Sequence, residues 1–481
     1  MSGPLRVMFL SAEAAPLVKV GGLGDVAGSL PGELLRLPEK PDVRVFLPYY
    51  PAVRSQVPNP EPTASFEIAH QDGSILGQAY RAVINQVPYY FIDGSPIGKS
   101  PGVYSGDNTL DGAKFAFFSL AAMELARILD WKPDLIHAHD WHASPAVYHL
   151  SRIKFTDDFF KETRSLLTVH NLPYLGEGAE KALAEFGLPP ARHPALPDWT
   201  RGFPLVLGLS AADRINTVSP GYAGEMLTAE FGAGLEGFLR TRKDDLSGIL
   251  NGLDLIDWDP MTDPALPNHY AADSLGIRQK NKLELQAEVG LQTNPETPLL
   301  AMINRMDAQK GVDLALDALR LLDGQDWQAL ILGTGDPALE AAARTLANDY
   351  PQVSSVLKYD GALARRIYGG SDIILIPSRY EPCGLTQMIG MRYGCVPVAR
   401  ATGGLKDTIT DYRRNQVQGT GFLFDQATPT ALADTIKRSL LVFKDKRRWR
   451  GLQRRGMKRD FSWGQSARKY ISLYNEIAQR T

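Results

Sequence analysis

The sequence alternates short apolar runs with segments of helical periodicity, and this alternation restricts the possible folds more than any other feature. In the first half the apolar runs are RVMFL, VRVFL, YYFI, DLIHAH, SLLTVH and DRINTVS. In the second half they are PLLAMINR, WQALILG, DIILIPS, CVPVA and GFLF. Strands that alternate with helices are typical of parallel sheets covered by helices. Each half therefore predicts a doubly wound α/β domain.

The chain length agrees with two large domains, since 481 residues exceed the roughly 100–200 residues of one ordinary domain. The segment 250–273 is rich in Asp, Pro and Asn and lacks helical periodicity, so it reads as a linker. We expect an N-terminal domain over 1–250, a C-terminal domain over 251–455 and a last segment over 456–481. In that last segment a capping-box pattern, Ser462 with Gln465, precedes apolar residues at helical spacing and predicts an amphipathic helix.

Composition argues against two classes of partner. The formal net charge of -2 gives no global excess that would favour nucleic acid or a membrane surface. A local basic segment, 444–460, holds nine Lys and Arg residues, and with no nucleic-acid module in sight we interpret it as a solvated helix face. No apolar run approaches the roughly 18 residues of a membrane-spanning helix. The chain has only two cysteines, which favours a reducing, cytoplasmic location.

The glycine-rich stretch KVGGLGDV, residues 19–26, first suggests a dinucleotide-binding loop. Gly22, Gly24 and Ala27 fit the pattern G-x-G-x-x-A. The context does not fit, because ten residues separate the first apolar run from the loop and no acidic residue ends the second predicted strand. A second glycine motif, GSPIGKS at 94–100, is one residue too short for a phosphate loop. Both interpretations are rejected on context.

The same loop nevertheless suits an anionic ligand. Backbone N–H groups at the start of a helix attract phosphate, and Lys19 adds a cation in front of the glycines. The second half supplies Arg305 and Lys310 in NRMDAQKG and a glycine turn in LGTGD, each after a predicted strand. Glu381 follows the run DIILIPS. Ligands of open α/β sheets bind beyond the carboxyl ends of the strands, where all of these groups are expected.

Eight motifs occur in one order between residues 19 and 408: KVGGLGDV, HAHDWHA, TVHNLPY, LNGLD, NRMDAQKG, GTGD, SRYEPCGLTQ and ATGGLKDT. Together they closely resemble the glycogen and starch synthases that use ADP-glucose, which form glycosyltransferase family 5. The resemblance covers essentially the whole chain. It implies the GT-B fold, with two Rossmann-like domains facing each other across a cleft and a terminal helix that crosses back to the N-terminal domain.

The resemblance also implies an activity. Such an enzyme transfers glucose from ADP-glucose to the non-reducing 4-OH of an α-1,4-glucan such as glycogen or a starch primer, with retention at the anomeric carbon and without a cofactor. A non-catalytic glucan-binding protein of the same fold is the alternative. Loss of a diphosphate-binding cation or of Glu381 would favour that alternative, but all of these positions are filled.

By this resemblance, catalytic roles fall to Glu381, His170, Arg305 and Lys310. Arg305 and Lys310 would neutralise the departing diphosphate together with Lys19. Gly21 and Gly22 would offer backbone amides to the phosphates, and Asp25 would lie nearby.

The sugar-facing groups come from other motifs. His170 and Asn171 in TVHN resemble the pair that contacts the transferred glucose, and Glu381 resembles the acidic residue that faces this sugar. Asp140 and Tyr104 fall where the family lines the glucose and acceptor side. Tyr359 falls where an aromatic ring stacks on adenine. The remaining implied substrate-binding residues are Gly333, Gly335, Cys383, Gly384, Leu385 and Thr386.

No metal is expected. DLIDWD at 254–259 contains the only D-x-D candidate, and turn formation explains it better. His137, His139 and His142 do not share one face of a strand and lack further ligands. Eight residues after Glu381, where many GT-B enzymes carry a second glutamate for the ribose, this chain has Ile389. That departure separates it from the group that resembles sucrose synthase.

Overall fold

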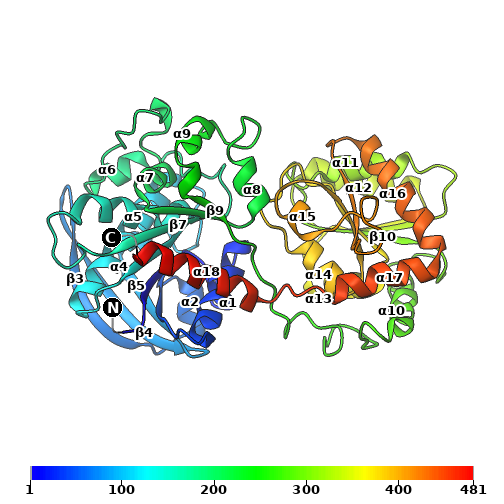
Figure 1. Ribbon diagram of the computed structural model, residues 1–481, viewed down its shortest axis with the longest axis horizontal. Coiled ribbons are helices and arrows are strands. Elements are labelled where there is room, and N and C mark those ends of the chain that lie inside the picture. Colours follow the sequence, from blue (N-terminus) through cyan, green and yellow to red (C-terminus); the bar gives the residue numbers. More distant parts are fainter. Residues whose placement is uncertain (1–2, 480–481) are drawn as a thin grey trace. The chain divides into compact units, whose positions relative to one another are not determined.

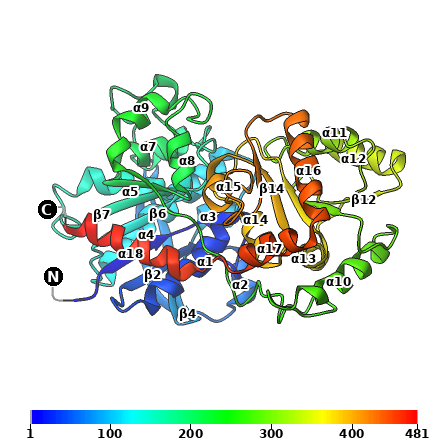
Figure 2. The ribbon, with the colours of Figure 1, turned by 45° about the vertical axis from the view of Figure 1, so that its right-hand side comes forward.

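The computed structural model describes residues 3–479 and consists of two compact α/β units (Figures 1 and 2). Unit 1 contains the chain up to Gly252 together with the chain from Trp463 onward, and unit 2 contains Leu253–Ser462. Each unit has its own hydrophobic core. The chain therefore passes from one unit to the other twice.

Unit 1 is built on a nine-stranded sheet in the order β3-β4-β5-β2-β1-β6-β7-β8-β9. All neighbours from β5 to β9 pair in parallel, as the alternating pattern predicts. The strands are β1 Arg6–Leu10, β2 Asp42–Pro48, β3 Glu61–His70, β4 Gly73–Ile84, β5 Val87–Gly94, β6 Leu135–His139, β7 Arg164–Val169, β8 Arg214–Thr217 and β9 Leu246–Gly248.

The expectation of a wholly parallel sheet is wrong at one edge of unit 1. Strands β3 and β4 form an antiparallel hairpin, and β4 pairs antiparallel with β5. In β3 the inward residues Phe66 and Ile68 alternate with exposed neighbours, so the strand has no continuous apolar run. Only Gln71 and Asp72 connect the two strands, and Gly73 follows with a φ of 124°, which favours glycine.

Helices cover both faces of this sheet (Figure 1). The helices of unit 1 are α1 Gly22–Arg36, α2 Pro51–Gln56, α3 Ser95–Lys99, α4 Asn108–Ile128, α5 Asp140–Ile153, α6 Glu180–Glu185, α7 Pro204–Ala211, α8 Pro220–Glu225, α9 Glu236–Thr241 and α18 Trp463–Gln479, with short 3-10 turns at Asp198–Thr200 and Lys243–Asp245. The α1 helix starts directly at the glycine loop, so the loop lies at a helix N-terminus.

The last helix, α18, packs within unit 1 against α1 and β7 (red in Figures 1 and 2). Its apolar face enters the core of unit 1 through residues that include Trp463, Ile471 and Ile477. Two tyrosines add polar contacts: the Tyr474 hydroxyl lies 2.7 Å from His137 Nδ1, and Asn216 donates to the Tyr470 hydroxyl over 3.0 Å. The terminal segment is thus part of the folded core of this unit.

Unit 2 has a six-stranded, wholly parallel sheet in the order β12-β11-β10-β13-β14-β15. Its strands are β10 Leu299–Ile303, β11 Gln328–Leu332, β12 Val353–Val356, β13 Ile373–Ile376, β14 Val396–Arg400 and β15 Phe422–Phe424. Its helices are α10 Leu275–Glu288, α11 Val312–Arg320, α12 Pro337–Asp349, α13 Gly361–Gly370, α14 Thr386–Arg392, α15 Gly403–Thr408, α16 Pro429–Lys444 and α17 Lys446–Met457.

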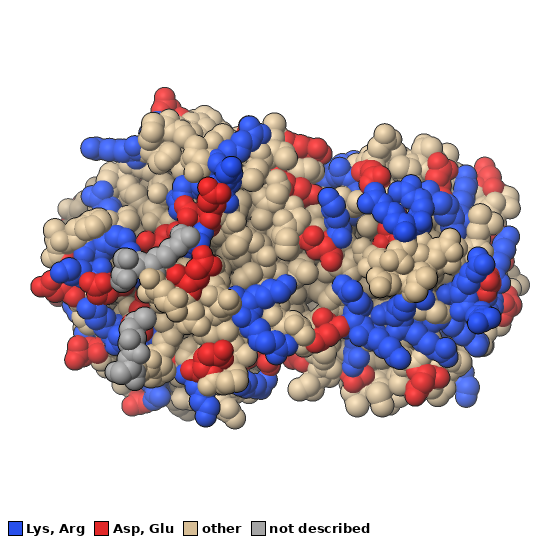
Figure 3. Space-filling view, viewed as in Figure 1, with Lys and Arg blue, Asp and Glu red and all other residues tan. Residues whose placement is uncertain are grey.

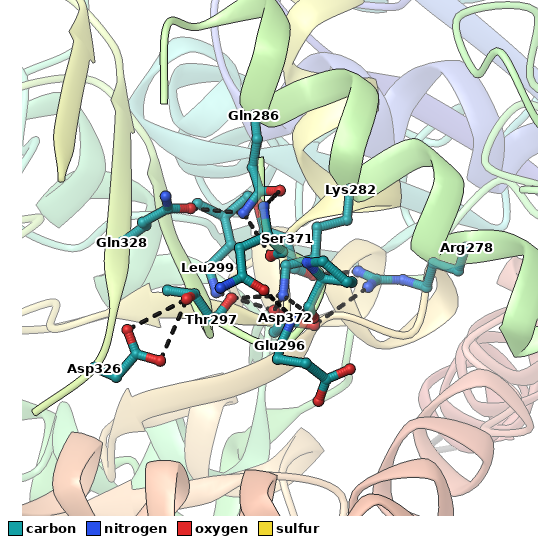
Figure 4. Close-up of polar contacts among 12 residues, drawn as sticks. Arg278, Lys282, Gln286, Glu296, Thr297, Leu299, Asp326, Gln328, Ser371 and Asp372 are labelled. Atoms are coloured by element: carbon teal, nitrogen blue, oxygen red, sulfur yellow. Dashed lines mark hydrogen bonds and ion pairs between the residues drawn. The ribbon is translucent and has the colours of Figure 1, made fainter. Parts of the chain in front are cut away.

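A buried polar network holds α10 against the amino ends of β10 and β13 (Figure 4). Lys282 lies 2.7 Å from Asp372 Oδ2 and donates to the carbonyl of Thr297 over 2.6 Å. Asp372 also accepts the backbone N–H of Leu299 over 2.9 Å. Because both charges are buried, their mutual pairing avoids the large cost of an isolated buried ion. The opposite, carboxyl edge of the sheet carries the predicted site loops.

The segment before α10 forms turns, as expected for DLIDWD. Asp254 Oδ1 accepts the backbone N–H groups of Ile256 and Asp257, and Asp257 also forms an ion pair with Arg365 at 2.8 Å. These carboxylates are used for local structure. Among residues 3–479, no group of three or more His, Cys, Asp or Glu side chains is arranged to hold a metal ion.

The basic segment forms α17, whose apolar residues are buried and whose Lys and Arg residues are mostly exposed. Figure 3 shows these cations gathered on one face of unit 2. This arrangement agrees with the predicted solvated helix face. Within the described residues, none of the helices is both long and apolar enough to cross a membrane.

Candidate active site

In unit 1 the glycine loop joins β1 to α1. Lys19 Nζ lies 2.7 Å from Asp25 Oδ1, and the lysine side chain is half exposed. A Cβ atom added to Gly21 or Gly22 would meet nothing within 4 Å, and neither residue has a positive φ. The fold itself does not require glycine at these two positions. Their lack of side chains is explained better by a ligand that approaches the backbone.

The loop is held by Glu13, a residue that sequence reasoning missed. Its Oε2 accepts the backbone N–H groups of Val20 over 2.6 Å and of Gly21 over 2.9 Å. Glu13 is 2% exposed. The Gly21 amide, expected to bind phosphate, therefore already donates to a carboxylate in this structure. No short motif predicts this contact, because nothing in the sequence distinguishes Glu13 from other polar residues that follow a strand.

Tyr104 reaches the same carboxylate from a loop distant in the sequence. Its hydroxyl donates to Glu13 Oε1 over 3.3 Å, and burial raises the pKa of this hydroxyl above its usual range. The Tyr104 loop is fixed by the fully buried Lys114, which donates to the carbonyls of Gly102 and Val103 and pairs with Asp111 at 2.8 Å. The Lys114–Asp111 pair is a second feature that the sequence alone did not reveal.

Asp140 fixes the backbone of the predicted sugar-binding pair. Its Oδ1 accepts the N–H of His170 over 2.6 Å, and its carboxylate also accepts the N–H of Asn171. Burial is the largest influence on this carboxyl and raises its pKa to about 7. The side-chain Oδ1 of Asn171 is buried without a hydrogen-bond partner among the described residues. A hydroxyl group of a sugar is the kind of donor that this oxygen lacks.

His170 is a neutral hydrogen-bonding group in this environment. Its Nε2 lies 2.9 Å from His139 Nδ1, and burial lowers the pKa of His170 to about 3. His137 contacts Thr168 and Tyr474, so its ring is used in the core. A neutral imidazole beside a sugar can form hydrogen bonds but adds no positive charge.

In unit 2 two of the three charged residues with predicted catalytic roles contact each other directly. Lys310 Nζ lies 2.9 Å from Glu381 Oε1 and 2.7 Å from Oε2. Ser378 donates to Glu381 Oε2 over 2.8 Å, and Glu381 is 7% exposed. Arg305 is more exposed and pairs with Asp307 at 2.5 Å. The loops after β10 and β13 thus bring Lys310 and Glu381 into direct contact.

The two glycines of GTGD are required by the packing of the fold. The sequence alone did not distinguish this requirement from ligand binding. A Cβ atom at Gly333 would lie 2.0 Å from the carbonyl oxygen of Asn304, and one at Gly335 would lie 2.4 Å from that of Met306. Gly335 also donates its N–H to Glu340 over 2.9 Å. Both glycines therefore permit the loops after β10 and β11 to pack closely, whatever else they bind.

The EPCGLT loop is also locally braced. Gly384 has a φ of 74°, which favours glycine, and the Gln387 side chain donates to the carbonyls of Cys383 and Gly384. Cys383 is buried. Leu385 caps α14, which begins at Thr386. Gln387 is a further support that sequence reasoning missed.

Tyr359 lies on the loop between β12 and α13. Its side chain is 89% exposed, just before α13. An aromatic ring left in solvent on a loop has its face open for stacking.

Comparison with known families agrees with this geometry. The family described as the starch synthase catalytic domain matches residues 6–241. The family described as glycosyl transferases group 1 matches residues 286–451. These two matches fall in units 1 and 2 respectively.

Similar proteins extend over the full chain. A glycogen synthase of Serratia proteamaculans is 40% identical over 98% of this chain and 100% of that protein. Glycogen synthase 2 of Geobacter sulfurreducens is 38% identical over 98% of this chain and 99% of that protein.

Among solved structures, the catalytic domain of starch synthase IV from Arabidopsis thaliana, bound to ADP and acarbose, has a TM-score of 0.87 and 31% identity and covers 99% of this chain and 100% of that one. A sucrose-phosphate synthase from Thermosynechococcus elongatus, with a TM-score of 0.62 and 19% identity over 99% of this chain and 100% of that one, shares the fold. With the motifs, both sheets and the paired charges in place, the chain belongs to the glycogen and starch synthase family of GT-B glycosyltransferases.

Proposed function

We propose that this protein is a glycogen synthase that transfers glucose from ADP-glucose to the non-reducing 4-OH of an α-1,4-glucan, with retention at the anomeric carbon. The observation that carries the proposal is the Lys310–Glu381 pair at the carboxyl edge of the unit 2 sheet. The pair joins a cation that would bind the leaving diphosphate to a carboxylate that would face the sugar, in a chain of this family.

The chemistry explains why both charges are needed. Breaking the bond between glucose and the diphosphate increases the negative charge on the phosphates and gives the sugar oxocarbenium character. Lys310 and Arg305 would stabilise the phosphates, and Glu381 would face the positive sugar. Lys19 and the open backbone at Gly22 would contribute to diphosphate binding from unit 1.

The unit 1 groups would hold the sugars. Asp140 fixes the backbone of His170 and Asn171, and the unpaired Oδ1 of Asn171 would accept a hydroxyl of the transferred glucose. His170 would form a neutral hydrogen bond with the same sugar. Tyr104 would contribute its ring on the acceptor side.

The donor base is proposed to be adenine. The Arabidopsis starch synthase structure contains ADP, and the open ring of Tyr359 is available for stacking on a purine. Stacking of a base on an aromatic side chain is worth about 1–3 kcal/mol. We therefore expect Tyr359→Ala to raise the KM for ADP-glucose roughly tenfold with kcat nearly unchanged. Phe155→Ala removes an equally exposed ring from unit 1 and should change neither constant.

The activity is tested by incubating the protein with ADP-glucose and glycogen in the presence of a chelator, and by measuring ADP release and glucose incorporation together. We expect both products in equal amounts, and a lower kcat/KM with UDP-glucose. Glycogen binding without ADP release would instead indicate a non-catalytic glucan-binding protein. Equal kcat/KM values for the two donors would overturn the assignment of adenine.

A further inference from the structure

Glu13 holds the glycine loop and the Tyr104 loop, which are expected to bind different ligands. One carboxylate oxygen accepts two successive backbone N–H groups of the glycine loop, and the other accepts the hydroxyl of Tyr104. The glycine loop carries Lys19 and is expected to bind the donor diphosphate, whereas Tyr104 is expected on the acceptor side. Glu13 itself has no role in the proposed transfer.

The contacts of Glu13 are buried. Glu13 is 2% exposed, and a buried carboxylate is stable only when its oxygens are well hydrogen-bonded. The two N–H groups, at 2.6 and 2.9 Å, come from the residues directly before α1, where the helix dipole also favours a negative charge. The carboxylate therefore occupies donors that would otherwise be free to bind an external phosphate.

The Tyr104 loop is held by contacts of its own. Lys114 and Asp111 clamp the backbone around Tyr104: Lys114 donates to the carbonyls of Gly102 and Val103, and Asp111 accepts the N–H of Ser105 over 2.9 Å. The Tyr104 hydroxyl is thus presented to Glu13 from a fixed loop. A displacement of the tyrosine would pull on the carboxylate, and through it on the two amides of the glycine loop.

We propose that Glu13 is a positioning residue that couples donor and acceptor binding by tying the glycine loop to Tyr104. This inference rests on the proposed function for the identity of the two ligands. A glucan that shifts the Tyr104 side chain would thereby shift the Glu13 carboxylate and the loop that receives the diphosphate. By reciprocity, the donor product would favour glucan binding by the same factor.

The test measures the Kd of ADP by calorimetry with and without saturating maltohexaose. For the unmodified protein we expect maltohexaose to tighten ADP binding at least fivefold, a typical coupling between two sites. Glu13→Gln keeps the size of the side chain but removes its charge, and it should reduce this factor below twofold. Glu33→Gln, which removes a carboxylate paired with Arg36 on α1, is the matched control and should keep the full factor.

Tyr104→Phe is a second test of the same coupling, in case the Glu13 variant fails to fold. It removes only the hydroxyl and leaves the bonds between Glu13 and the glycine loop in place, so its loss of coupling would identify the tyrosine–glutamate contact itself. A factor that stays fivefold or more in either variant, or that is absent in the unmodified protein, overturns the inference. Coupling that depends on Glu13 in a protein that does not turn over ADP-glucose would contradict the proposed function alone.

Discussion

Lys310 and Glu381 form an ion pair in the structure, yet they are proposed to contact different parts of the substrate. The pair is bidentate, and the carboxylate is further held by Ser378. A diphosphate would compete with Glu381 for the lysine, because two negative groups would then share one ammonium. Donor binding would therefore loosen the pair and leave the carboxylate to the sugar. The two residues should accordingly respond differently to substitution.

We expect Lys310→Ala to lower kcat by roughly a hundredfold, or about 3 kcal/mol, the usual effect of losing one preorganised charged contact to a transition state. Glu381→Gln should lower kcat to a similar extent while the Kd of ADP changes less than threefold, since the lysine stays available to the phosphates. ADP binding and turnover are measured in parallel for both variants. Asp317→Asn, which removes a surface partner of Arg320 in unit 2, serves as the control. Loss of ADP binding with intact turnover in Glu381→Gln would place the glutamate in the nucleotide pocket.

The raised pKa of Asp140 gives a pH-dependent prediction. Burial raises its pKa from 3.8 to about 7, so the folded protein binds a proton that the unfolded chain releases. Stability from this group is present at low pH and is lost as the pH rises through about 7. Asp140→Asn keeps an oxygen acceptor for the N–H of His170 but cannot ionise.

We therefore expect the stability of Asp140→Asn, relative to the unmodified protein, to rise between about pH 4 and pH 7 and to level off above it. Urea unfolding at several pH values measures this difference. Asp198→Asn, at a side chain that is 95% exposed, should show no such trend. A difference that is constant over the whole range would mean that the Asp140 carboxyl titrates normally.

At the scale of elements, continuous apolar runs predicted strands reliably, because parallel strands covered on both faces must be apolar throughout. Every run named in the sequence overlaps a strand of the structure. The missed strands have no such run. Strand β3 alternates buried and exposed residues, and β12 has the sequence VSSV. A search for continuous apolar runs finds central strands. It does not find edge strands, of which only one face is covered.

The site could be predicted where function requires particular residues within one loop. The motifs located Lys19, Lys310 and Glu381 on loops that follow strands, and the roles of these residues remain proposals. Glu13 could not be found in this way, because its contact with Tyr104 spans 91 positions. Contacts between distant loops depend on how the strands are ordered in the sheet, which no single motif encodes.

The helix α18 gives a prediction about one element. Tyr474 is fully buried, and its hydroxyl is hydrogen-bonded with His137 of β6. Tyr474→Phe keeps the ring but leaves the His137 nitrogen unpaired, which should cost about 1–3 kcal/mol of stability. Hydrogen exchange should accelerate in β6, β7 and α18 but not in β10 or β13. Asn475→Ala, at the exposed neighbouring position, should leave all of these rates unchanged.

At the scale of the whole molecule, two separate cores imply two cooperative units. The core of unit 1 includes residues of α18, and the core of unit 2 is made by residues between Leu300 and Leu452. Proteins with several domains commonly depart from two-state unfolding. The proposed donor contacts are unequally divided, since Arg305, Lys310, Tyr359 and Glu381 all belong to unit 2.

We therefore expect calorimetry to resolve two unfolding transitions and ADP to raise mainly one of them. At a hundred times its Kd, a ligand adds about 2.7 kcal/mol to the stability of the unit that binds it. For a unit of this size each kcal/mol shifts Tm by about 2–4 °C, so the unit 2 transition should rise by roughly 5–10 °C. Tyr474→Phe should lower the other transition, which assigns each one to its unit. If ADP and Tyr474→Phe shift the same transition, the donor contacts and α18 would belong to one cooperative unit, and the division of the proposed site would be wrong.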